Sequence, residues 1–286
     1  MNLDIHGNAA YAYTGGKPFD PDLPTVVFIH GAQNDHSVWA LQSRYLAHHG
    51  YSVLAVDLPG HGHSGGPALA SVEEIASWLV AVMDAAGVRR AILAGHSMGS
   101  LIALETGHLV PGLVIGLALL GTTYPMKVAD ALLATARDDE AAAIDTVNIW
   151  SHSSIAHKPS FPGPGFSVMV GARRLMQRMS ARNPQQLFYT DFAACNAYAN
   201  GELAARSITC PVLFVFGSKD VMTPPRSTKL LTSLLGHGRI VTVDAGHQLM
   251  AEAPDAVLDA LIDFAAAAAE KDKETSCASP SSTLTT

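Results

Sequence analysis

RAILAGHSMGSLIAL, residues 90–104, joins two apolar runs through a serine that has a glycine two positions away on either side. An apolar run of this kind, bounded by turn residues and continued at once by a second run, predicts a buried strand that turns directly into a buried helix. Such a turn requires Gly95 and Gly99, because a β-carbon on either side would clash where the strand and the helix approach each other. Ser97 therefore lies at the corner, with its hydroxyl raised above the edge of a sheet and close to the N–H groups of the helix start.

Length and composition limit the class of protein. The chain has 286 residues, of which 48% are hydrophobic, and this is enough for a large core. The net charge of −7 provides no basic surface of the kind that nucleic acids and anionic membranes require, so we expect neither as a partner. No C-x-x-C pair suggests zinc or redox chemistry, and we predict three free thiols. They are Cys195, Cys210 and Cys277.

The sequence carries no targeting or membrane signal that we can identify. Residues 1–5 lack a basic segment followed by an apolar one, so no signal peptide is predicted. No apolar run reaches the ~18 residues that a membrane span requires. We therefore expect a cytoplasmic protein, unless a leader has been removed, that exists as a monomer or a homodimer.

Apolar strands alternate with helical patterns along most of the chain. Residues 2–14 suit an N-terminal hairpin at a sheet edge, and Ser71 and Glu74 form a capping box that opens a helix. Further buried strands are expected at residues 25–30, 52–57, 114–120, 211–217 and 238–243. Strands that are apolar on both faces and alternate with helices predict an α/β fold, with a mostly parallel central sheet covered by helices on both faces.

Residues 122–208 interrupt this alternation, because they contain no convincing strand. Four helices are predicted there, at residues 126–137, 141–150, 166–180 and 184–198. An insertion of this kind predicts a helical cap, or lid, over the carboxyl ends of the strands, where ligands bind in such sheets. The core then comprises residues 1–121 and 209–270, with a final helix that ends near Glu270, and the polar residues 271–286 are predicted to form a disordered tail.

A serine hydroxyl is a poor nucleophile unless a base takes its proton and an acceptor orients that base. Asp220 and His247 each follow one of the last two predicted strands. Because the carboxyl ends of parallel strands meet at one edge of a sheet, both residues can converge on Ser97. Asp244 is a weaker candidate for the acceptor, since it lies closer to the strand, and Asp220 is also placed to cap the turn that follows it.

Four motifs in this order resemble those of the α/β-hydrolase fold family, in its capped serine hydrolase branch. They are His30-Gly31, Asp57-x-x-Gly60-x-Gly62-x-Ser64, Gly95-His96-Ser97-Met98-Gly99, and Asp220 with Gly246-His247. The resemblance covers about residues 20–121 and 205–268. It implies that Ser97 is the nucleophile, His247 the general base and acid, and Asp220 its orienting partner.

The same resemblance implies an oxyanion hole built from the backbone N–H groups of Ala32 and Met98. Side chains nearby and in the insertion are predicted to line an apolar substrate pocket. They are His30, Gln33, Trp39, Phe166 and Met169. We interpret the loop histidines as structural or substrate-facing, because no His-x-x-x-His spacing supports a metal, and we expect neither a metal nor a cofactor.

Three functions remain open on this sequence. The first is a serine hydrolase (a carboxylesterase) that cleaves a small-molecule ester, or a related carbonyl substrate, through an acyl-enzyme. The second is a C–C bond hydrolase of vinylogous diketones, as in aromatic degradation, which an arginine reaching the substrate carboxylate would favour; the candidates are Arg173, Arg174 and Arg178. The third is a non-catalytic small-molecule receptor whose lid reports ligand binding to a partner.

Overall fold

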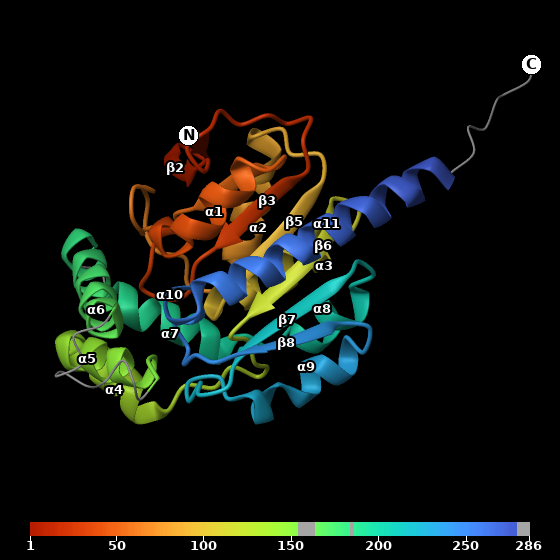
Figure 1. The fold of residues 1–286 in the computed structure, drawn as a ribbon. Coiled ribbons are helices and arrows are strands. Elements are labelled where there is room, and N and C mark those ends of the chain that lie inside the picture. Colours follow the sequence, from red (N-terminus) through yellow and green to blue (C-terminus); the bar gives the residue numbers. More distant parts are fainter. Residues whose placement is uncertain (154–163, 184–185, 279–286) are drawn as a thin grey trace, which may run out of the picture.

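An eight-stranded sheet with helices on both faces forms the body of the protein in a computed structural model that describes residues 1–153, 164–183 and 186–278 (Figure 1). The strand order is β1-β2-β4-β3-β5-β6-β7-β8. The strands are β1 (Asn2–Ile5), β2 (Asn8–Tyr13), β3 (Thr25–Ile29), β4 (Ser52–Val56), β5 (Ala91–His96), β6 (Val114–Leu120), β7 (Val212–Gly217) and β8 (Arg239–Val243). The N-terminal hairpin β1–β2 pairs antiparallel to β4, and the other neighbours are parallel. The predicted α/β fold class is confirmed.

Each face of the sheet is covered by its own set of helices. One face packs against α2 (Val72–Ala85), α3 (Met98–Leu109), α8 (Gly201–Ser207) and α9 (Lys229–Leu234). The other packs against α1 (Ala40–Ala47), α10 (Leu249–Glu252) and α11 (Pro254–Ala278). Because successive side chains of a strand point to opposite faces, Val27 enters the first core and Phe28 the second. The fully apolar strands therefore follow from burial on both faces.

The connection between β5 and α3 is the tightest turn in the core. A β-carbon on Gly95 would lie 2.0 Å from the carbonyl oxygen of Gly99, and a β-carbon on Gly99 would lie 2.3 Å from the carbonyl oxygen of Ile29 in β3. Ser97, between the two glycines, has a φ of 54°, which is in the left-handed region that side chains disfavour. The two glycines allow β3, β5 and α3 to meet, and the serine occupies the strained position.

Four helices between β6 and β7 lie together beyond the carboxyl ends of the strands (Figure 1). They are α4 (Asp130–Asp138), α5 (Glu140–Trp150), α6 (Pro164–Arg182) and α7 (Leu187–Ala197). A small core around Leu132, Ile144 and Phe188 joins them, and Ala32 from the end of β3 packs against it. We refer to α4–α7 as the cap.

The helices of this insertion differ from prediction in two respects. The first helix begins at Asp130 and not near Met126, and before it the N–H of Val128 donates to the side chain of Asn196 in α7 at 3.2 Å. The last helix of the insertion, α8, was not predicted as a separate element. It packs on α3, so it covers the sheet and not the strand ends.

The C-terminal helix α11 continues to Ala278, so the prediction that it ends near Glu270 is wrong. Its alanine-rich sequence favours a helix, and Ala268 lies against Gly116 of β6, where an added β-carbon would be 3.0 Å away. Arg90 also forms an ion pair with Asp272 at 3.2 Å. The rest of the predicted tail, residues 279–286, lies outside the described residues.

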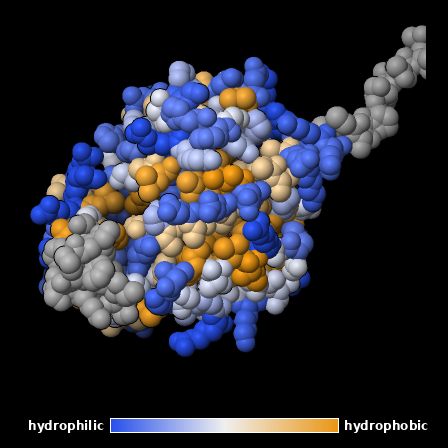
Figure 2. Space-filling view, in the orientation of Figure 1, coloured by the Kyte–Doolittle hydropathy of each residue, from blue (hydrophilic) through white to orange (hydrophobic). Residues whose placement is uncertain are grey.

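The face that carries α11 shows hydrophobic side chains at the surface beside this helix, over β7 and the edge strand β8 (Figure 2). Ile240 on β8 is 55% exposed. None of the described helices combines the length and the apolar character that crossing a bilayer requires.

Gly99→Ala is expected to destabilise the fold by about 3 kcal/mol or more, because the new methyl group would overlap the backbone of β3. The measurement is the free energy of unfolding from chemical denaturation. Gly112→Ala is the control, since its β-carbon would meet no described atom within 4 Å, and we expect a change within about 0.5 kcal/mol. Equal stability of the two variants would contradict the close approach.

Candidate active site

Ser97 lies half-exposed at the turn between β5 and α3. Its N–H donates to the carbonyl oxygen of Leu120 in β6 at 2.9 Å, and its own carbonyl accepts from the N–H of Ser100 at 2.8 Å. Hydrogen bonds on both sides thus hold the left-handed backbone in place. The residue predicted as the nucleophile is fixed by the sheet and the helix, while its side chain faces a cavity.

Asp220 and His247 come together at the ends of β7 and β8. The His247 ring donates its Nδ1 proton to Oδ2 of Asp220 at 2.8 Å, and both side chains are buried. The strands are paired so that Gly217 lies opposite Val243, which places the two following loops side by side. Because Nδ1 carries the proton, Nε2 of a neutral His247 is the basic nitrogen.

The Asp220 carboxylate is held by a turn of its own. Oδ1 accepts from the N–H groups of Met222 and Thr223 at 2.8 and 2.9 Å, and Oδ2 accepts from the Thr223 hydroxyl at 2.8 Å. Burial works against ionisation, but the attraction of His247 and these hydrogen bonds outweigh it and keep the pKa of Asp220 below its ordinary value. Asp220 therefore remains an anion that can orient a histidine.

His96 forms a hydrogen bond with the backbone of His247. Its Nε2–H donates to the backbone carbonyl of His247 at 2.8 Å, and the two ring centres are 4.8 Å apart. Burial, with the nearby His247, lowers the pKa of His96 to about 3, so it stays neutral. A neutral ring under His247 fixes the backbone of that residue without adding a competing charge.

A cavity of about 140 Å³ lies between the sheet edge and the cap, and Ser97 and His247 both line it. Most of the other lining side chains are apolar, and they come from α4, α5, α7 and the loops beside them. They are Met126, Val128, Ala129, Leu132, Trp150, Phe192, Cys195, Val221 and Met222. The exposed Lys127 is the one cationic side chain among the described lining residues. The cavity is therefore small and apolar, with a positive charge at its edge.

Ala32 lines this cavity as well, and Met98 is the first residue of α3. The N–H groups at the start of a helix have no acceptor within that helix, so the N–H of Met98 is available to a ligand. The positive end of the α3 dipole lies at the same place. Both backbone groups predicted for an oxyanion hole therefore belong to segments that end next to Ser97.

The structure places four of the predicted pocket residues away from the cavity, and two of them lie in the core. His30 is buried, its Nδ1–H donates to the Gly31 carbonyl at 2.8 Å and its Nε2 accepts the N–H of Leu58 at 3.1 Å. Trp39 is also fully buried, and its ring lies 5.0 Å from that of Phe28. Both are core residues, because their side chains are fully buried and do not line the cavity.

Gln33 and the two predicted residues of α6 also differ from expectation. The Gln33 side chain points into the cap, where its Nε2 donates to the carbonyl of Met176 and to Ser180. Met169 is half-buried on α6, and it is not among the residues that line the cavity. The side chain of Phe166 lies outside the described part of the structure. Among the described residues, the cap lines the cavity through α4, α5 and α7, together with the segment before α4.

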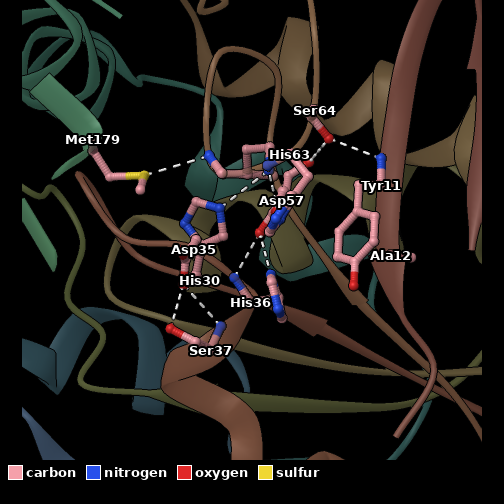
Figure 3. A network of polar contacts seen from close by, with 12 residues as sticks. Tyr11, Ala12, His30, Asp35, His36, Ser37, Asp57, His63, Ser64 and Met179 are labelled. Carbon is pink, nitrogen blue, oxygen red and sulfur yellow. Dashed lines mark hydrogen bonds and ion pairs between the residues drawn. The ribbon is translucent and has the colours of Figure 1, made fainter. Parts of the chain in front are cut away.

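Asp57 joins the loops that follow β3 and β4 (Figure 3). Its Oδ1 accepts from the backbone N–H and from Nδ1–H of His36, at 2.7 and 2.8 Å; its Oδ2 accepts from the same two groups of His63, at 2.8 and 3.2 Å. Among the described residues, this is the group whose ligand atoms lie close enough together to hold a metal ion. Both oxygens already accept two N–H groups each, so the structure supports a structural anchor.

Some residues at the site were not found by sequence reasoning. Thr223 follows Asp220 by three positions, and an Asp-x-x-Thr spacing is a signal for a turn that the carboxylate caps. Lys127 lies in a segment that was predicted to be helical. Asp191 lies in the middle of a predicted helix, where nothing in the sequence indicates that its carboxylate reaches back to the core.

A model of the alpha/beta hydrolase family matches residues 26–260, which is most of the chain. The protein therefore belongs to the alpha/beta hydrolase family. The match runs from β3 to the first part of α11, and so it includes segments of both parts of the core and the cap between them.

Several similar proteins are named as hydrolases. The (E)-2-((N-methylformamido)methylene)succinate hydrolase of Acinetobacter baylyi is 26% identical over 82% of this chain and 88% of its own length. The 3-oxoadipate enol-lactonase 1 of the same organism is 23% identical over 82% of this chain and 85% of its own. The solved structure of the enol-lactonase from Burkholderia xenovorans LB400 superposes with a TM-score of 0.79 at 22% identity, and covers 92% of this chain and 99% of its own.

Asp57→Asn is expected to remove a stabilisation that depends on pH. Burial opposes ionisation, but the hydrogen bonds and charge of His36 lower the pKa of Asp57 to about 2. A lowered folded-state pKa stabilises the protein above the unfolded pKa of ~3.9, and the stabilisation is lost as the pH falls toward 2. The free energy of unfolding of wild type should exceed that of the variant by about 2 kcal/mol at pH 6.

Urea unfolding between pH 6 and pH 2.5 measures this effect, because the gap between wild type and variant should narrow as the pH falls. Asp259→Asn on the exposed side of α11 is the control, and it should track wild type throughout. A gap that stays constant with pH would show that Asp57 stabilises the fold by shape and not by charge.

Proposed function

We propose that this protein hydrolyses carboxylic esters with small apolar acyl groups through an acyl-enzyme formed on Ser97. One observation carries the proposal: Ser97 and His247 line the same small cavity, and His247 presents Nε2 because Asp220 holds its Nδ1–H. A strained serine, a histidine and a buried carboxylate that orients it are the parts that nucleophilic acyl transfer requires.

The residues then act in two half-reactions. Ser97 Oγ attacks the ester carbonyl while His247 takes its proton, and the backbone N–H groups of Ala32 and Met98 stabilise the oxyanion. His247 returns the proton to the departing alcohol, which leaves an acyl group on Ser97. Water, deprotonated by His247, attacks the acyl group, and the acid leaves when the proton is returned to Ser97. Asp220 stabilises the imidazolium in both steps.

The lining of the cavity supports a compact acyl group. At about 140 Å³, the cavity is well below the several hundred Å³ that enclose drug-sized ligands. Trp150, Phe192 and Met222 provide apolar surface, while the Lys127 ammonium, bound to the carbonyl of Asn196 at 2.9 Å, lies at the edge. This ammonium offers a partner for a carboxylate on the substrate, and the similar hydrolase of Acinetobacter baylyi is named for a succinate derivative, which is a dicarboxylate.

The three arginines that were candidates to bind the substrate carboxylate of a C–C hydrolase do not favour that alternative. Arg173 pairs with Asp145 in α5 at 2.5 Å, and Arg178 pairs with Asp35 at 3.1 Å. Neither these residues nor Arg174 is among those that line the cavity. The ester therefore remains the proposed substrate, and a receptor without turnover becomes an outcome of the experiment.

Turnover of p-nitrophenyl esters from acetate to decanoate tests the proposal. We expect the highest kcat/KM for short acyl chains, because the cavity is small, and a loss of about 10³-fold or more in Ser97→Ala. The control is the unfolding temperature of Ser97→Ala, which should match wild type. Activity that persists in this variant would overturn the assignment of the nucleophile, and no turnover of any ester by wild type would favour the C–C hydrolase or receptor hypotheses.

Asp220→Asn is expected to lower kcat by about 10²- to 10⁴-fold, because an amide in place of the carboxylate no longer fixes the Nδ1–H tautomer or stabilises the imidazolium. The matched control is Asp244→Asn. Asp244 lies exposed at the end of β8 and pairs with Lys219 at 2.8 Å, so this variant should retain wild-type kcat. The reverse order of the two effects would assign the orienting carboxylate to Asp244.

A further inference from the structure

Gln33, the residue after Ala32, is held by the cap through both its backbone and its side chain. Its N–H donates to Oδ2 of Asp191 in α7 at 2.7 Å, and its side-chain Nε2 donates to the carbonyl of Met176 in α6 at 3.1 Å. Gln33 is fully buried and has a φ of 58°. A non-glycine residue keeps this conformation only where its surroundings impose it, and here those surroundings are cap groups.

Asp191 has a second partner that balances its charge. Its Oδ2 lies 2.9 Å from Nε2 of His61, and Nδ1 of His61 lies 3.0 Å from the carbonyl oxygen of Pro59. Neither of these oxygens carries a proton, so both ring nitrogens donate and His61 is an imidazolium. Burial alone would lower the pKa of His61, but Asp191 raises it above its ordinary value. The His61–Asp191 pair is thus a buried ion pair between core and cap.

The neighbouring histidine has the opposite protonation. His30, whose ring centre is 4.9 Å from that of His61, accepts the N–H of Leu58 at Nε2 and must be neutral. Burial, assisted by the charge of His61, lowers the pKa of His30 to about 4. One positive charge, on His61, therefore faces one negative charge, on Asp191, and the N–H of Gln33 shares the carboxylate.

We propose that Asp191 is a positioning residue for the oxyanion hole: it fixes the peptide that follows Ala32, so that docking of the cap on the core completes the site. This inference rests on the proposed function, since it assigns the Ala32 N–H to the oxyanion. Asp191 is 1% exposed and is not among the residues that line the cavity, so it acts through Gln33 and not on the substrate.

The physical basis is the orientation of one backbone segment. Asp191 holds the peptide group between Ala32 and Gln33. Only the φ and ψ of Ala32 separate this peptide from the one that carries the Ala32 N–H, so a rotation of the first changes the direction of the second. A charge-assisted hydrogen bond to a buried carboxylate is short and strong, and it resists this rotation. Oxyanion donors act only when they are aimed in advance at the place where charge develops.

The test uses Asp191→Ala, which removes the acceptor, in the full-length protein. With a p-nitrophenyl ester, kcat should fall about 10- to 100-fold and KM should stay within about twofold, because the loss is felt only when the oxyanion forms. With an alkyl trifluoromethyl ketone as inhibitor, Ser97 Oγ adds to the carbonyl carbon while His247 takes the proton. The resulting O⁻ then lies in the oxyanion hole. The Ki of the ketone should rise by the same factor as kcat falls.

Two further variants separate positioning from general stability. Asp191→Asn keeps an oxygen that can accept the N–H of Gln33, so it should recover kcat to within about threefold of wild type. Arg178→Gln breaks another ion pair between cap and core, Arg178 with Asp35 at 3.1 Å, and it should leave kcat and the ketone Ki at wild-type values. If Asp191→Ala does not fold, amide exchange decides: the N–H of Gln33 must be protected in wild type and less so in Asp191→Asn.

The outcomes distinguish this inference from the proposed function. Wild type that does not hydrolyse esters, or Ser97→Ala that still does, overturns the proposed function. If wild type hydrolyses esters and Ser97→Ala does not, the proposed function stands. Unchanged kcat and Ki in Asp191→Ala then overturn only the positioning role of Asp191. The positioning role is also overturned if Asp191→Ala raises KM with kcat unchanged. It is likewise overturned if the Gln33 amide of wild type exchanges as fast as an exposed amide.

Discussion

The close approach of three backbone segments at Gly95 and Gly99 is the constraint on which this molecule depends. Because neither position carries a side chain, β5, the start of α3 and the end of β3 come very close together. A single β-carbon added at either glycine would overlap the neighbouring backbone. Ser97 must then take a left-handed backbone, which turns its side chain out of the sheet. The end of β3 is brought to the same place, so that Ala32 lies beside the serine.

A similar constraint places the rest of the site. Gly217 ends β7 so close to the loop after β8 that a β-carbon there would lie 2.3 Å from the carbonyl oxygen of Gly246. Asp220 and His247 follow directly from these two segments, and their side chains meet in a buried hydrogen bond. The polar groups are thus aligned by backbone packing, and the turn around Thr223 then keeps the carboxylate charged. Such preorganisation is the main contribution that a protein makes to charge stabilisation.

The cap is joined to the core by polar contacts as well as by its apolar core. Asp191 and Arg178 each reach a residue of the loop after β3, and Arg182 donates to the carbonyl of Gly62 at 2.9 Å. Of the charged contacts between the described parts of the cap and the core, only the His61–Asp191 pair is buried on both sides, and desolvation offsets much of the attraction in such a pair. These contacts join the cap to the loops after β3 and β4.

Local sequence signals predicted the fold class, because apolar runs, glycine positions and capping residues act over a few neighbours. The order of Ser97, Asp220 and His247 on strand ends could also be predicted, since parallel strands bring their carboxyl ends to one edge. The hydrophobic pattern at the start of the insertion suggested a helix. There, however, the N–H of Val128 donates to Asn196, which is far along the chain. The predicted end of α11 was wrong for a related reason, because Asp272, beyond the apolar pattern, pairs with Arg90 from a distant segment.

The sequence by itself determined the family and the elbow that presents Ser97, because glycine spacing and strand-end polarity are properties of short segments. Only the tertiary structure decided which side chains line the cavity. Gln33 and Trp39 were reasonable candidates from their position in the chain, yet both point into packed interiors. It also decided the protonation of His30 and His61, and the partner of Asp191. Those depend on charges and acceptors from distant segments, and a hydrogen bond between Gln33 and Asp191 exists only after the cap has docked.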